Sequence, residues 1–96
     1  MQKIIGGLRY DTDTATLVAS HDRRDGSGRN EYLYKTKNGR FFIHYVTVGE
    51  DRLDKRIYKT EVIEPLNPKL ARLRYEAMPT YHVGYADVFG EGPKDA

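Results

Sequence analysis

The sequence predicts a small α+β domain, built on an antiparallel sheet of about four to six strands with two short helices. Three observations carry this prediction. Several segments alternate apolar and polar residues with the period of two that is typical of half-buried strands. Gly6-Gly7 and Asn38-Gly39 each separate two such segments, and both dipeptides favour hairpin turns. Asn67-Pro68 joins an N-cap residue to a proline at the first helical position, which predicts the start of a helix.

The N-terminal part is expected to form a hairpin, a helix and a loop, in that order. Residues 3–10 form the hairpin because Gly6-Gly7 supplies the positive φ angles of its turn. Residues 12–21 are expected to form a helix that docking must stabilise, since its threonines have low helix propensity. Its buried face would carry Ala15, Val18 and Ala19. Residues 22–30 contain no apolar residue and therefore predict an exposed loop.

The central segment predicts a hairpin over 31–48 with its turn at Asn38-Gly39. A two-residue turn would set Tyr34 opposite Ile43. The core face would then carry Tyr32, Tyr34, Thr36, Phe41, Ile43 and Tyr45. The solvent face would carry Leu33, Lys35, Lys37, Arg40, Phe42 and His44. A three-residue turn would shift the register and redistribute both faces, and the sequence leaves this alternative open.

The C-terminal part predicts a strand, a helix and a last short strand. Residues 56–64 are rich in Ile, Tyr, Thr and Val, and Pro65 closes this strand. A helix follows from Asn67-Pro68 to the stop at Pro79. Its apolar stripe is expected to consist of Leu70, Ala71, Leu73, Tyr75, Ala77 and Met78. Residues 81–85 alternate as a final strand would. We expect one globular domain over residues 1–89 and a disordered tail over 90–96, because a chain of 96 residues is too short for two domains that each fold alone.

Composition excludes several classes of function. Sixteen Lys and Arg against fourteen Asp and Glu give a net charge of +2, far from a strongly basic nucleic-acid binder or an acidic DNA mimic. The absence of cysteine excludes disulfides, thiolate chemistry and the usual zinc fingers. The chain has no apolar run of membrane-spanning length and no secretory signal at its start, so we expect a cytoplasmic protein without membrane contact.

Catalytic motifs are also missing from the sequence. No phosphate-binding loop, dinucleotide fingerprint or metal-binding spacing occurs, and the histidines (His21, His44 and His82) never recur at helical spacing. We therefore expect no catalytic residue, no cofactor and no metal. A base beside phosphate-binding arginines at 21–24 is an alternative, but charged residues collect at a helix end anyway. A small ribonuclease with His44 or His82 as its base ranks last, because such enzymes tend to be more basic.

Two segments of mixed charge suit charge-complementary contacts with a protein partner. The first contains Asp22, Arg23, Arg24, Asp25 and Arg29, and the second contains Glu50, Asp51, Arg52, Asp54, Lys55 and Arg56. An alternative is a nucleic-acid-binding module, in which cations interleaved with Tyr32, Tyr34 and Tyr58 would contact phosphates while the rings stack on bases. Exposed strands with Tyr and Val also allow two copies to pair edge to edge as a homodimer.

Three pieces of the chain resemble small accessory proteins of phages and integrated mobile elements, of the anti-CRISPR-like kind. They are KIIGGLRYDTDTA at 3–15, LYKTKNGRFFIH at 33–44, and VIEPL at 62–66 followed by a helix to Met78. They cover about half of the chain, in the same order and at similar distances as in that family. The chain departs from the pattern at 45–51 and beyond Pro79.

This resemblance implies a non-enzymatic inhibitor that acts by stoichiometric binding in the cytoplasm of a bacterial host. Its partner would be a host CRISPR-Cas effector protein or complex, which it would keep from engaging or cutting target DNA. The departing segments are those that would set partner choice. No functional residue is therefore carried over from the family, and the two mixed-charge segments stand as the expected contact.

Overall fold

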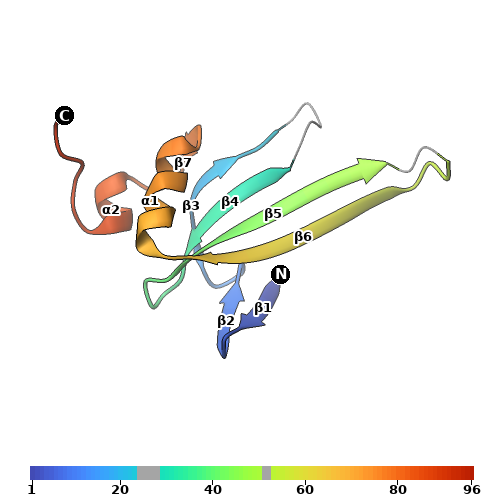
Figure 1. Ribbon diagram of the computed structural model, residues 1–96, viewed down its shortest axis with the longest axis horizontal. Coiled ribbons are helices and arrows are strands. Elements are labelled where there is room, and N and C mark those ends of the chain that lie inside the picture. The colour runs from blue at the N-terminus through green and yellow to red at the C-terminus, as the bar shows by residue number, and fades with distance from the viewer. Residues whose placement is uncertain (24–28, 51–52) are drawn as a thin grey trace.

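The fold is α+β, as predicted, with a five-stranded antiparallel sheet, a separate two-stranded sheet and two helices (Figure 1). The computed structural model describes residues 1–23, 29–50 and 53–96. The strands are β1 (Gln2–Ile5), β2 (Leu8–Asp11), β3 (Thr16–His21), β4 (Asn30–Lys35), β5 (Phe41–Glu50), β6 (Ile57–Leu66) and β7 (Thr80–Tyr81), and the helices are α1 (Pro68–Ala77) and α2 (Tyr85–Phe89). The large sheet has the order β6-β5-β4-β3-β7. The molecule is long and flat, at 51 × 35 × 18 Å.

The N-terminal hairpin forms as predicted, but the helix predicted over 12–21 is wrong. β1 pairs with β2 around Gly6 and Gly7, which have φ angles of +59° and +77°. β3 then lies inside the large sheet between β4 and β7. Val18, Ala19 and Ser20 are consecutive and all buried, because both faces of this strand are covered. The pairing of β3 with β4 also contains a register shift between Leu17 and Ala19. The helix propensity of this segment is too low to outweigh the packing that it gains as a strand of the sheet.

The central hairpin has the three-residue turn, so the two-residue register is wrong. Thr36 donates its N–H to the Arg40 carbonyl at 2.7 Å, and Gly39 donates to the Thr36 carbonyl at 2.9 Å. Gly39 has φ +80°, which closes the turn in the left-handed region. Ile43 consequently lies opposite Leu33, and not opposite Tyr34 as the two-residue turn would have placed it. The shift by one residue exchanges the faces of one strand relative to the other.

Each face of the large sheet carries its own core. On the helix-covered face the buried residues come from the sheet, α1 and α2: Val18, Ala19, Leu33, Phe41, Ile43, Tyr45, Ala71, Tyr75, Met78 and Val88. On the other face, next to the β1–β2 hairpin, the buried residues are Tyr10, Phe42 and Ile63, with Tyr34 packed against them. Phe42 and His44, both expected on the solvent face, are buried. The sheet is therefore covered on both sides at the end where α1 and β1–β2 lie.

Helix α1 begins where the sequence predicts. The Asn67 side chain accepts the N–H of Leu70 at 2.8 Å, and Pro68 occupies the first turn. Of the predicted apolar stripe, the structure buries Ala71, Tyr75 and Met78 and leaves Leu70 and Leu73 exposed. The helix thus packs through a narrower side than its apolar stripe suggests.

The last predicted strand is wrong beyond its first residue. β7 covers only Thr80–Tyr81, and residues 85–89 form α2, which the sequence analysis missed. Gly84 stands at the N-cap and Gly90 ends the helix with φ +79°. Val88 is buried in the core and the Phe89 ring stacks on Phe41 with centroids 5.5 Å apart. Residues 90–96 follow as exposed chain without helix or strand.

Candidate functional site

A two-stranded arm extends beyond the rest of the sheet. β5 and β6 pair continuously along ten residues each, whereas β4 reaches only to the pair Asn30–Val46. Residues 47–50 and 57–60 therefore project alone, and we call them the arm (Figure 1). Four residues of strand give it a length of about 13 Å.

The arm exposes apolar side chains that a small domain would normally bury. Ile57 is 77% exposed, and Leu53, next to the arm in the β5–β6 connection, is 94% exposed. Val48 and Tyr58 are about half exposed. The Tyr58 ring lies directly over Gly49, where any Cβ would overlap it, so glycine permits this close packing. Apolar side chains gathered at one exposed projection indicate a contact surface.

The two mixed-charge segments lie at the same end of the sheet as the arm, because both connect strands at that end. Of the first segment, the structure describes Asp22, Arg23 and Arg29 after β3 and before β4. Of the second, it describes Glu50, the last residue of β5, and Asp54, Lys55 and Arg56 between β5 and β6. Arg24, Asp25, Asp51 and Arg52 lie outside the described residues. This end lies opposite the β4–β5 turn.

Two described residues of the first segment are anchored to the sheet. The Arg29 guanidinium lies 3.9 Å from the centroid of the Tyr45 ring, a cation–π contact. The Arg23 backbone N–H donates to the Asn30 side-chain oxygen at 2.7 Å. These contacts fix where the chain leaves β3 and where it enters β4.

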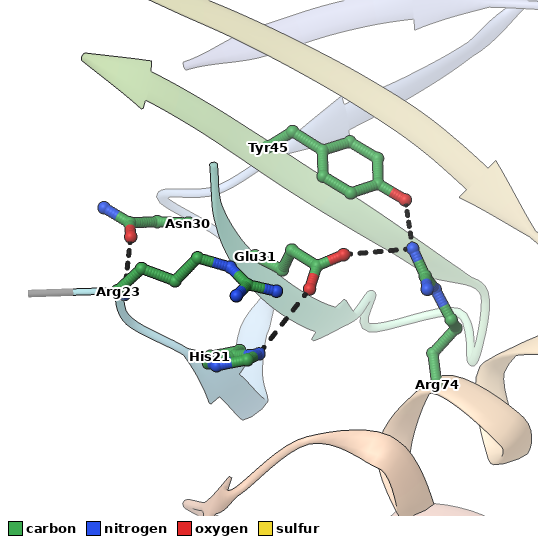
Figure 2. A network of polar contacts seen from close by, with 6 residues as sticks. All are labelled: His21, Arg23, Asn30, Glu31, Tyr45 and Arg74. Atoms are coloured by element: carbon green, nitrogen blue, oxygen red, sulfur yellow. Dashed lines mark hydrogen bonds and ion pairs between the residues drawn. The ribbon is translucent and has the colours of Figure 1, made fainter. Parts of the chain in front are cut away.

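A polar network beneath this end ties α1 to the sheet (Figure 2). Glu31 on β4 accepts from the Arg74 guanidinium at 3.1 Å and faces His21 Nδ1 at 3.9 Å. Arg74 also donates to the Tyr45 hydroxyl at 2.6 Å. Burial would lower the pKa of Arg74, but the Tyr45 hydrogen bond and the Glu31 charge outweigh it and raise that pKa, so the guanidinium remains cationic. Sequence reasoning missed this network, because its members lie far apart in the chain and no local motif links them.

Two polar pairs lie on the sheet face opposite the helices. Ser20 Oγ and His82 Nε2 are 2.9 Å apart, and His44 Nε2 and Glu61 Oε1 are 3.1 Å apart. Tyr32 lies in the strand between them, paired with Ser20 on one side and His44 on the other. These contacts form two separate pairs and not one chain from nucleophile to base to carboxylate. In the described ranges, no group of three His, Asp or Glu side chains could hold a metal ion.

The His44–Glu61 pair shifts both pKa values. Burial lowers the pKa of His44 below 6.5, and the Glu61 hydrogen bond opposes this only in part. Partial desolvation would raise the pKa of Glu61, but Lys59 and His44 together lower it. His44 is therefore neutral at pH 7, and Glu61 is ionised. Since the unfolded chain protonates His44 more readily, the stability that His44 contributes is present above pH 6.5 and is lost as the pH falls through its folded pKa.

The imidazole of His44 is expected to titrate with a midpoint below 6.5 when followed by NMR. Glu61→Gln should lower this midpoint further, because it removes the charge that favours the imidazolium. Glu64→Gln, on the opposite face of the same strand, is the matched control and should leave the midpoint unchanged. A midpoint at or above 6.5 in the unmodified protein, or a rise in Glu61→Gln, would contradict this assignment.

A cavity of about 240 Å³ lies at the other end of the molecule, between the β4–β5 turn and the start of α1. Gly39, Phe41 and Pro68 contribute to its lining. Its volume is below the roughly 300 Å³ at which small-molecule pockets begin. The exposed end with the arm is therefore the stronger candidate for a functional site.

None of the described helices is long and apolar enough to cross a membrane.

No family model matches this chain, and neither a curated protein nor a solved structure is significantly similar to it.

Proposed function

We propose that this chain is a non-enzymatic inhibitor from a phage or mobile element, which binds a host CRISPR-Cas effector complex in the bacterial cytoplasm and blocks target DNA binding or cleavage. One observation supports a binding role above all. The described parts of both mixed-charge segments lie at one end of the sheet, beside an arm that exposes apolar side chains. The sequence resemblance to anti-CRISPR-like proteins supports the choice of partner.

The chemistry of this end suits a protein surface. Leu53 supplies an exposed apolar centre, and Glu50, Asp54 and Lys55 surround it in sequence with charges of both signs. Protein interfaces combine an apolar centre with a polar rim in the same way. Charges of both signs at this end can pair with opposite charges on an effector surface, which fixes the orientation of the contact.

The proposal is tested by adding the purified protein to DNA-cleavage reactions of CRISPR effectors of several types. We expect cleavage to stop with one type, at a stoichiometric ratio of inhibitor to effector. The variant Glu50→Lys/Asp54→Lys should weaken binding to that effector by at least about tenfold, since charge reversal at an interface turns attraction into repulsion. Its melting curve should remain unchanged.

The matched control is Asp13→Lys/Glu76→Lys, which makes the same charge change away from the arm, in the β2–β3 connection and on α1. It should inhibit as well as the unmodified protein. Inhibition of no effector would overturn the proposal. Inhibition that both double variants retain equally would remove this end from the interface.

A nucleic-acid-binding module is the second candidate, because a two-stranded ribbon can enter the major groove and this one carries Tyr58 and Lys59, with Arg56 directly before it in the chain. Fluorescence anisotropy with single- and double-stranded oligonucleotides at low salt separates the two functions. Binding that falls steeply with salt would favour this candidate. No binding at low salt would dismiss it.

A further inference from the structure

The free edge of β6 is the longest strand edge that the described part of the sheet leaves without a neighbour. β6 pairs with β5 on one side only, over ten residues in one unbroken register. β7, at the opposite edge, covers only two residues. Strand edges are usually protected by bulges, prolines or short length. Residues 57–64 have none of these, since Pro65 lies beyond them and the pairing with β5 contains no shift.

We propose that two copies of this chain pair antiparallel through β6, centred on Thr60, which joins the two five-stranded sheets into one continuous sheet. This inference goes beyond the proposed function and does not depend on it. A two-fold axis perpendicular to the sheet generates the pair, and such an axis keeps each face of the sheet on the same side. Residues that lie opposite one another must therefore point to the same face of the sheet. Because side chains alternate between the two faces, one strand can slide along the other only by two residues at a time.

Only the register centred on Thr60 makes the neighbouring side chains complementary. It sets Lys59 opposite Glu61 of the partner subunit, and the symmetry produces this ion pair twice. It also sets Tyr58 opposite Val62 of the partner subunit, an aromatic–β-branched pair of the kind that stabilises sheets. Tyr58 and Val62 are both about half exposed in the single chain, so pairing would cover apolar surface that now contacts water.

The neighbouring registers are unfavourable. A shift by one step in either direction sets Lys59 against Lys59 of the partner subunit, or Glu61 against Glu61 of the partner subunit. The favoured register also continues outward, with Arg56 opposite Glu64 of the partner subunit and Ile57 opposite Ile63 of the partner subunit. Charged side chains on an exposed strand commonly prevent edge pairing, but in this one register Lys59 and Glu61 attract their counterparts on the partner subunit.

Within one chain, Lys59 already lies 3.5 Å from Glu61, and both are at least partly exposed. An exposed pair of this kind contributes little, so the lysine loses little when it turns toward the partner. Glu61 can keep its contact with His44, because a carboxylate accepts several hydrogen bonds. Both helices of both copies would lie on the same face of the joined sheet.

The test is the mass of the full chain in solution, measured by light scattering after size exclusion across the micromolar range. We expect the mass to rise with concentration toward twice 11.1 kDa. Lys59→Glu should weaken the dimer by about tenfold or more, because it replaces two attractive pairs by two repulsive ones. The double variant Lys59→Glu/Glu61→Lys restores both pairs in exchanged positions and should recover the dimer.

Lys69→Glu makes the same charge change on α1 and is the matched control, which should dimerise like the unmodified chain. Circular dichroism confirms that each variant is folded. A monomer at every concentration overturns the proposal. A dimer that survives Lys59→Glu, or one that the double variant fails to recover, also overturns it, because pairing would then use another surface or register. None of these outcomes depends on a CRISPR effector, so the dimer and the proposed function fail separately.

Discussion

Phe42→Ala is expected to lower the free energy of unfolding by about 3–5 kcal/mol, the largest effect of any substitution considered for this chain. Phe42 is fully buried. Its ring stacks on Tyr34 at a centroid distance of 5.1 Å and meets the edge of Tyr10 at 5.6 Å. Alanine would leave a cavity between these rings and Ile63, and a sheet held by neighbours on both sides can collapse only partly to fill it.

The measurement is chemical denaturation at one fixed protein concentration, together with the melting temperature. A loss of 3 kcal/mol in a domain of this size lowers the melting temperature by roughly 12 °C or more. Val48→Ala is the matched control, since Val48 lies on the same strand and the same face but is exposed on the arm. It should cost less than about 0.5 kcal/mol. Equal effects of the two substitutions would show that the second core, beneath β1–β2, does not stabilise the fold.

Phe42 also shows where sequence reasoning stops. The hairpin and its turn dipeptide were predictable, because Asn38-Gly39 has few other uses between two alternating segments. Whether the loop has two or three residues depends on the hydrogen bonds of Thr36 and Arg40, and the sequence does not decide between them. This difference of one residue in loop length decides which residues of β4 share a face of the sheet with Phe42. The three consecutive buried residues from Val18 likewise have no amphipathic period, so a strand enclosed on both faces was indistinguishable from a short helix.

The candidate site was predictable in composition but not in shape. Charged connections such as 22–29 are visible in the sequence, and antiparallel pairing then places alternate connections at one end of a sheet. The arm was not predictable, because it arises from the difference in length between β4, with six residues, and the β5–β6 pair, with ten residues in each strand. Nothing local to Asn30 signals that β4 starts short. Leu70 and Leu73 show the same limit for a helix, since an apolar stripe does not reveal how wide the receiving surface is.

Arg74→Met is expected to lower the free energy of unfolding by about 1–2 kcal/mol. Methionine keeps the apolar stem, so the loss measures the guanidinium and its bonds to Glu31 and Tyr45. The Glu31 side chain is only 14% exposed and would keep the His21 ring beside it, with Nδ1 at 3.9 Å. Arg74 itself is 39% exposed, so solvent screens the pair and holds the expected loss below that of a fully buried one.

Arg72→Met tests whether the effect comes from the network or from any arginine on this helix. Arg72 also pairs with a carboxylate, Glu91 at 3.3 Å, but both side chains are well exposed, and we expect a loss of less than about 0.5 kcal/mol. A double-mutant cycle of Arg74→Met with Glu31→Gln isolates the pair. The double variant should lose clearly less stability than the sum of the two single variants, because removing both charges leaves no carboxylate without its partner. A coupling energy near zero would mean that Tyr45, and not Glu31, is what holds Arg74 against the sheet.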